Sequence, residues 1–269
     1  MENKADTSTV LKKEAKNPGK LTRMFLTLYD VFQFIVRFFR EGFLPPYEGK
    51  ELLRQCYDIG YRSLLLISTT GFITGMVFTK QSRPSLAEFG ATSWLPSLVA
   101  IALLRTLAPL LTALIAAGKV GSSIGAELGS MRVTEQIDAM EVSATNPFKF
   151  LVTTRVLAST ITIPILTFYT AMIGMLGALL NVSLSEGTSP TAFFQTALES
   201  ITFLDITAST IKAILFGFTI GIVGCYQGYN SSKGTEGVGK AANSSVVIGM
   251  FLIFIEEVVS VQFFGLFRT

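Results

Sequence analysis

Apolar residues are gathered into five long runs that are separated by shorter polar stretches. The runs cover about residues 59–78, 95–117, 157–182, 206–226 and 246–264. A helix needs roughly 20 predominantly apolar residues to cross the hydrocarbon core of a bilayer, and each run has about that length. The pattern therefore predicts an all-α polytopic membrane protein with five transmembrane helices. Composition agrees, because 49% of the residues are hydrophobic and only 15% are charged.

A sixth, amphipathic helix is predicted over residues 21–40, before the first run. Its apolar side chains fall at 21, 24, 25, 28, 32, 35, 36 and 39, which is the spacing of one helical face. We expect it to lie in the plane of the membrane interface, because no soluble domain is left whose core it could join. The predicted organisation is a polar tail (1–20), an interfacial helix region (21–54) and a transmembrane domain (55–269). The tail is polar, contains Glu2, Asp6 and Glu14 and has no apolar core, so it fits neither a secretory signal nor a transit peptide.

Basic residues are distributed unequally between the two sides that five spans define. The amino-terminal segment and the two loops on its side hold sixteen Lys and Arg residues, and the opposite side holds three. Because short loops rich in Lys and Arg stay in the cytoplasm, the amino terminus is predicted to be cytoplasmic and the carboxyl terminus periplasmic.

The polar segment GKVGSSIGAELGSMRVTEQIDAME, Gly118 to Glu141, separates the second and third runs. We expect it to form a cytoplasmic loop that carries a short helix with Thr134 as its N-cap. Val133, Ile137 and Met140 then share one side, and a helix of two turns would gain stability by burying them against a partner. The alternative, weighed equally, is a helix that rests on the membrane or on its own loops.

A stripe of small residues precedes this short helix. Glycines recur every three or four residues, at Gly118, Gly121, Gly125 and Gly129. On a helix they would line one face and permit close approach of another backbone, and simple loop flexibility is the competing interpretation.

Several charged residues fall inside the apolar runs, where an ionised group is costly unless it faces a cavity or a partner. Arg105 lies in the middle of the second run and is the best candidate for an inward charge. Arg62 and Lys212 lie near span ends, where a long side chain can extend to the interface. Glu256 and Glu257 are about 100° apart around a helix, so the two are not expected to face one direction.

Enzymatic chemistry is not indicated by the composition or by the motifs. The chain has no His, and its two Cys residues, Cys56 and Cys225, are far apart in the sequence, so the usual nucleophile–base pairs and metal sites are not expected. Residues 234–241 read GTEGVGKA, but the hydroxyl residue that ends a phosphate-binding loop is missing, and a membrane span precedes the segment instead of a strand.

The Gly118–Glu141 segment resembles the signature of the MlaE family, permeases of phospholipid-transporting ABC transporters. The similarity extends to GMVF (75–78) with Gln81, to ALLRTLAP (102–109) and to GYNSSKGTEGVGKAANSSVV (228–247), and it covers about residues 55–265. The resemblance implies a permease homodimer in the bacterial inner membrane, a cytoplasmic ABC ATPase dimer and a periplasmic MCE-domain protein that exchanges phospholipid with it. ATP and Mg²⁺ would be used by the ATPase, and this chain would bind no cofactor and no nucleic acid.

The resemblance also assigns residue roles. Gln81, Arg105 and Glu256 would be polar groups of the cavity or the membrane interior. The ATPase-coupling residues would be Val133, Thr134, Glu135, Ile137, Asp138, Met140 and Glu141. The chain departs from the family pattern at Thr106, where an acid is usual, and at Lys119, where Arg is common. A permease for another hydrophobic or small polar solute, and a scaffold without transport activity, are the alternatives.

Overall fold

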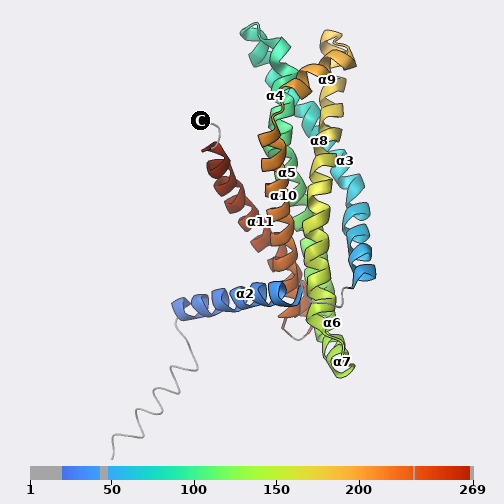
Figure 1. The fold of residues 1–269 in the computed structure, drawn as a ribbon, viewed down its shortest axis with the longest axis vertical. Coiled ribbons are helices and arrows are strands. Elements are labelled where there is room, and N and C mark those ends of the chain that lie inside the picture. Colours follow the sequence, from blue (N-terminus) through green and yellow to red (C-terminus); the bar gives the residue numbers. More distant parts are fainter. Residues whose placement is uncertain (1–19, 43–47, 233, 267–269) are drawn as a thin grey trace, which may run out of the picture. The chain divides into compact units, whose positions relative to one another are not determined.

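The described part of the chain is helical and contains no strand. The computed structural model describes residues 20–42, 48–232 and 234–266, and the chain divides into two units, residues 1–45 and 46–269. Five helical stretches in the described residues are long and apolar enough to cross a membrane (Figure 1). The prediction of an all-α polytopic membrane protein is therefore confirmed. The predicted polar tail lies almost entirely outside the described residues.

The first unit contains one described helix, α2 (Lys20–Gly42). It covers the helix predicted over residues 21–40. Arg37 and Glu41, one turn apart, form an ion pair with a distance of 2.7 Å between Nε and Oε1. The placement of α2 at a membrane interface remains a prediction.

The second unit is a bundle of long helices that run up and down beside one another (Figure 1). In chain order its α-helices are α3 (Gly49–Glu88), α4 (Leu95–Ala102), α5 (Ala108–Ala116), α6 (Ser122–Val133), α7 (Gln136–Val142), α8 (Thr154–Glu186), α9 (Pro190–Glu199), α10 (Phe203–Tyr229) and α11 (Thr235–Gly265). A 3₁₀ turn, η1 (Thr92–Trp94), precedes α4, and three π-helical segments are η2 (Leu103–Leu107), η3 (Ala117–Gly121) and η4 (Phe148–Thr153). Since α3 begins at Gly49, the end of the predicted interfacial region belongs to this bundle.

The second span is much longer than its apolar run. The elements from η1 to α6 form one continuous helical stretch, Thr92–Val133, with η2 and η3 as local widenings. The polar segment was predicted to form a loop from Gly118 onward. It instead continues the second span as a helix up to Val133, so the prediction is wrong for residues 118–133. The small residues of this segment do not end the helix, because neighbouring helices cover them.

The closest packing joins α3 to α8. A Cβ atom added to Gly75 would lie 1.8 Å from the carbonyl oxygen of Gly174, and one added to Gly177 would lie 2.2 Å from the carbonyl oxygen of Phe72. Only glycine permits this separation of the two backbones. These contacts hold the first and third spans together at mid-height.

The two ends of the bundle carry different short helices (Figure 1). We call them the α7 end and the α9 end. At the α9 end, Phe193 of α9 is fully buried in a cluster with Leu95, Val99, Ala178 and Val182. Helix α9 was not predicted, because a helix of ten residues is too short to appear as a span in the hydropathy pattern.

Candidate functional site

An ion pair inside the bundle connects the second and fourth spans. Arg105 of η2 donates to Asp205 of α10 through two hydrogen bonds, Nε to Oδ1 at 2.6 Å and Nη2 to Oδ2 at 3.0 Å. The side chain of Asp205 is 1% exposed and that of Arg105 is 29% exposed. A bidentate arginine–carboxylate contact fixes both the position and the orientation of the two side chains. The prediction that Arg105 faces inward agrees with this geometry.

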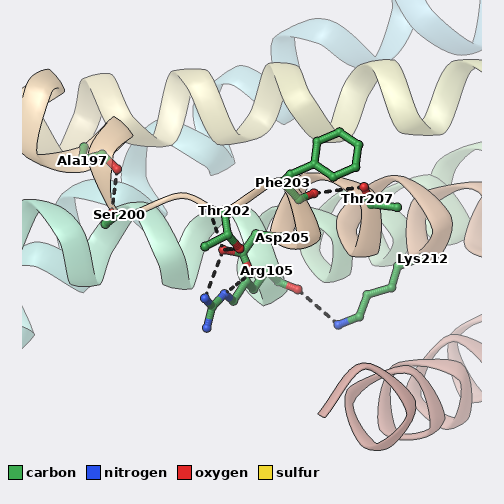
Figure 2. A network of polar contacts seen from close by, with 8 residues as sticks. All are labelled: Arg105, Ala197, Ser200, Thr202, Phe203, Asp205, Thr207 and Lys212. Atoms are coloured by element: carbon green, nitrogen blue, oxygen red, sulfur yellow. Dashed lines mark hydrogen bonds and ion pairs between the residues drawn. The ribbon is translucent and has the colours of Figure 1, made fainter. Parts of the chain in front are cut away.

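Asp205 is also held by the start of its own helix. Its Oδ2 accepts hydrogen bonds from the backbone N–H of Thr202, at 3.0 Å, and from the Thr202 hydroxyl, at 2.8 Å (Figure 2). Thr202 and Asp205 form a capping box, which satisfies the free N–H groups at the start of α10. The carboxylate that binds Arg105 is therefore fixed on a helix terminus.

Lys212 joins this pair to the last span. Its Nζ donates to the backbone carbonyl of Arg105 at 3.2 Å and to Oε1 of Glu257, on α11, at 2.8 Å. Pro109, four residues after Arg105, has no N–H to donate to that carbonyl in a regular helix, so Lys212 supplies a donor. We call Arg105, Thr202, Asp205, Lys212 and Glu257 the polar network; it links η2, α10 and α11.

One expectation about intramembrane charges is wrong, and the two adjacent acids of α11 differ in burial. Lys212 does not extend to an interface, because its side chain is only 5% exposed and binds Glu257. Glu257 is the more buried of the two adjacent acids, while half-buried Glu256 accepts a hydrogen bond from the Thr219 hydroxyl of α10. Both carboxylates reach α10 because that helix packs along α11. Arg62, by contrast, is 71% exposed and pairs with Asp58, one turn earlier.

A small cavity of about 200 Å³ opens beside the polar network. Arg105, Thr106, Asp205 and Lys212 line its polar side, and Phe264 is among its apolar residues. Thr106, where the family pattern has an acid, thus faces the same cavity as Asp205. Gln81 is exposed on α3 and does not line this cavity.

Three members of the network were not predicted from the sequence: Thr202, Asp205 and Glu257. A threonine followed three residues later by an acid, just before an apolar run, is a capping-box signal that could have drawn attention to Asp205. Nothing in the sequence could have paired Lys212 with Glu257, because 45 residues separate them.

The predicted coupling helix exists as α7, but its start and its buried face differ from the prediction. Thr134 ends α6 as its C-cap, and Glu135 takes a left-handed conformation (φ 57°) before α7 begins. Ile137 is fully buried within this chain, so it is not available to a partner in this conformation. Val133 and Met140 are half-buried, whereas Val142 is 91% exposed.

The charged residues of α7 remain on its outer side. Asp138 and Glu141 are exposed, and Asp138 accepts a hydrogen bond from Arg132 Nη1 at 2.7 Å, which ties α7 to α6. The surface that α7 offers consists of Gln136, Asp138, Ala139, Glu141 and Val142. It is more acidic than the apolar face predicted from spacing.

The glycine stripe faces the first half of α11. A Cβ atom on Gly125 would lie 2.5 Å from Ser245 Oγ, and one on Gly129 would lie 3.4 Å from Val238 Cα. Gly121 and Gly118 face Ser245 and Met250 at longer distances. The stripe therefore lies at a helix–helix contact.

The last span is the least covered of the five by its own chain. In the most apolar part of α11 only 22% of the residues are buried, against 56% in α10. Its exposed large apolar side chains are Val247, Ile248, Phe251, Phe254, Ile255, Val258, Val259, Val261 and Phe263. In the view of Figure 1 the carboxyl-terminal half of α11 diverges from α10.

Comparison with known proteins gives consistent matches. The model of the family described as Permease MlaE matches residues 52–263. A probable ABC transporter permease protein of Rickettsia prowazekii is 37% identical over 258 residues, which is 95% of this chain and 99% of the relative. A probable ABC transporter permease protein of Synechocystis is 36% identical, covering 83% of this chain and 87% of the relative. The chloroplastic protein TRIGALACTOSYLDIACYLGLYCEROL 1 of Arabidopsis thaliana is 33% identical, covering 80% and 61%.

Proposed function

Because this chain belongs to the MlaE permease family, we propose that it is the membrane-spanning subunit of an ABC transporter that moves phospholipid between the inner membrane and a periplasmic MCE-domain carrier. As an ABC transporter permease it works with a separate ATPase. The ATPase supplies the energy of ATP hydrolysis, and this chain supplies the path through the membrane.

The exposed apolar side chains of α11, from Val247 to Phe263, are the observation that supports lipid as the transported molecule. We call them the apolar wall of α11. Its aromatic and branched side chains can contact acyl chains, whose transfer from water is favourable at about 25 cal/mol per Å² of buried surface. A site for a small polar solute would instead need converging polar groups at mid-membrane. In the polar network such groups are occupied with one another, since Arg105 binds Asp205 and Lys212 binds Glu257. The name of the Arabidopsis relative is that of a glycerolipid, which agrees with a lipid cargo.

In a homodimer, the exposed apolar face of α11 in one copy would lie opposite the same face in the other copy. Two copies that face each other through α11 would enclose an apolar space that neither copy can form alone, with Glu256 near its edge.

Movement of the ATPase would reach this space through α7. We infer that the acidic outer face of α7 is held by the ATPase, with the amino terminus and the α7 end in the cytoplasm. Because α7 is tied to α6 by the Arg132–Asp138 ion pair, and α6 packs on α11 through the glycine stripe, a push on α7 is passed to the lipid-facing helix. In this scheme the fully buried side chain of Ile137 holds α7 against the rest of the chain.

The test uses two exposed apolar residues at opposite ends of the bundle. Val142 is 91% exposed at the α7 end, and Leu184 is 80% exposed near the end of α8. Each is changed to Asp, and the permease is co-expressed with the ABC ATPase and the MCE-domain protein of the same organism. Co-purification of the ATPase and ATP-dependent transfer of a fluorescent phospholipid from proteoliposomes are then measured.

We expect Val142→Asp to release the ATPase and abolish lipid transfer, and Leu184→Asp to leave the ATPase bound. Loss of the ATPase from both variants or from neither would refute the role of α7. An intact complex that hydrolyses ATP but transfers no phospholipid would refute the lipid cargo, in favour of another solute. Failure to capture any ATPase with the unchanged permease would favour a scaffold.

A further inference from the structure

A groove of about 310 Å³ lies at the α7 end, between α3 and the helical stretch formed by η3 and α6. It is separate from the polar network and shares no residue with the cavity beside it. The side chains that matter for its chemistry are Asp58, Arg62, Ser63, Lys119, Ser123 and Glu127. Hydroxyl and cationic groups from two spans therefore meet in one hollow.

The charges in the groove leave one cation uncompensated. Arg54 is paired with Glu51 at 3.5 Å, Asp58 with Arg62 at 3.2 Å, and Glu127 with Arg155 at 3.0 Å. Lys119 is half-buried and forms no ion pair or hydrogen bond with its side chain among the described residues. Because a buried charge is costly without a partner, the groove is suited to an anion beside Lys119.

A buried hydroxyl in the same groove also has no partner. Ser63 is 1% exposed, and its Oγ forms no hydrogen bond with the described residues. Its neighbour in the groove, Ser123, is exposed. Leaving a buried hydroxyl unsatisfied costs about 1–3 kcal/mol, so a ligand oxygen at this place would be stabilised.

The groove lies at the level where the apolar part of both helices ends. On α3 the apolar run resumes at Leu64, directly after Arg62 and Ser63. On the second span it ends at Ala117, two residues before Lys119. Tyr57 and Tyr61, on the same part of α3, are 60% and 62% exposed, with stacked rings 5.0 Å apart. Exposed tyrosines at the end of an apolar run are typical of the membrane interface, where lipid phosphates lie.

We propose that this groove is a phosphate-binding site, in which Lys119 and Ser63 donate to the phosphate oxygens and Arg62 adds a charge at the rim. Basic pockets between membrane helices bind anionic headgroups in this way. The phosphate can belong to an anionic lipid of the adjacent leaflet or be free in solution. The site lies between α3 and the stretch formed by η3 and α6, and its occupation does not depend on which cargo the permease moves.

The experiment compares three variants of the full-length permease. Lys119→Gln and Ser63→Ala remove the two proposed donors, and Lys80→Gln removes an exposed charge from the other end of α3 as a matched control. Each protein is titrated in micelles of a non-ionic detergent with phosphatidylglycerol and, separately, with inorganic phosphate, and bound ligand is counted by native mass spectrometry. Size-exclusion profiles verify that each variant is folded.

We expect Lys119→Gln to weaken binding about tenfold, as loss of a charged hydrogen bond predicts, and Ser63→Ala to weaken it by a few-fold. Lys80→Gln should bind like the unchanged protein. Binding of phosphatidylglycerol that inorganic phosphate does not displace would identify a lipid headgroup as the ligand, and displacement would identify soluble phosphate. The proposal is overturned if folded Lys119→Gln and Lys80→Gln proteins bind both probes equally.

Discussion

Individual charged residues are stabilised inside this bundle because each acid has a specific partner on another helix. Lys212 and Glu257 have side chains that are only 5% and 10% exposed, so little water reaches them. A buried ion pair adds little net stability compared with apolar residues, but removal of one partner leaves an uncompensated charge. The value of this pair is therefore that it fixes α10 against α11 in one register.

Lys212→Met should lower the free energy of unfolding by about 3–5 kcal/mol, because it leaves the Glu257 carboxylate buried and unpaired. The double variant Lys212→Met, Glu257→Met should recover much of that loss, since both charges are gone. Unfolding is measured by titration with sodium dodecyl sulfate in mixed micelles. Lys80→Met, at an exposed position, is the control and should change the value by less than about 0.5 kcal/mol. A double variant no more stable than Lys212→Met would contradict the ion pair.

The sequence predicted an inward position for Arg105 and left the cover of Ile137 open between the chain itself and a partner, whereas the prediction for Lys212 was wrong. Arg105 lies at the centre of a run, where no interface can be reached, so an internal partner was required. Lys212 is close enough to a span end for either outcome, and only the position of α11 decides between them. Ile137 has the spacing of a docking face, but spacing alone does not say whether the chain itself or a partner covers that face.

At the level of elements, close approach of helices depends on glycines that contact backbone. Gly75 and Gly174 let α3 and α8 touch, and the stripe from Gly118 to Gly129 lets α6 lie against α11. Within a membrane, where lipid tails are as apolar as side chains, such van der Waals packing is a main source of association. Hydropathy therefore predicts how many spans there are and in which order they come. It does not predict which spans pack together, because that depends on where the glycines lie.

Gly75→Ala should separate α3 from α8 and destabilise the fold by about 1–3 kcal/mol or more, because the new Cβ would lie 1.8 Å from a backbone oxygen that no rotamer can move. Gly239→Ala, in α11, is the matched control, since nothing lies within 4 Å of its Cβ position. The control should be neutral or gain up to about 1 kcal/mol from better helix propensity. Both are measured by the same detergent titration, and equal stability of the two variants would argue against the contact.

Helix boundaries were the part of the fold that the sequence determined least. Apolar runs mark the hydrocarbon-spanning part, but α3 and the second span extend well beyond it toward the α7 end. Polar helical turns beyond the bilayer are stabilised by their neighbours: Arg155 of α8 pairs with Glu127 of α6 at 3.0 Å. Hydropathy carries no signal for such contacts, which is why the polar segment was predicted as a loop.

For the whole molecule, five spans place the α7 end and the α9 end on opposite sides of the membrane. The proposed function requires the α7 end in the cytoplasm, where an ATPase can reach α7, and the sixteen-to-three distribution of basic residues predicts the same orientation. Two exposed positions report on the two ends: Ser143, directly after α7, and Thr191, in α9.

Each position is changed to Cys in a Cys56→Ser background, with Cys225 retained because it is fully buried. The protein is expressed in a bacterial inner membrane and treated with a membrane-impermeant maleimide. Thr191→Cys should be labelled in intact spheroplasts, and Ser143→Cys only in inverted vesicles, because the basic segments hold the α7 end inside. The Cys56→Ser parent should stay unlabelled in both preparations. The reverse pattern would place α7 in the periplasm, out of reach of any ATPase, and would overturn both the orientation and the coupling role proposed for α7.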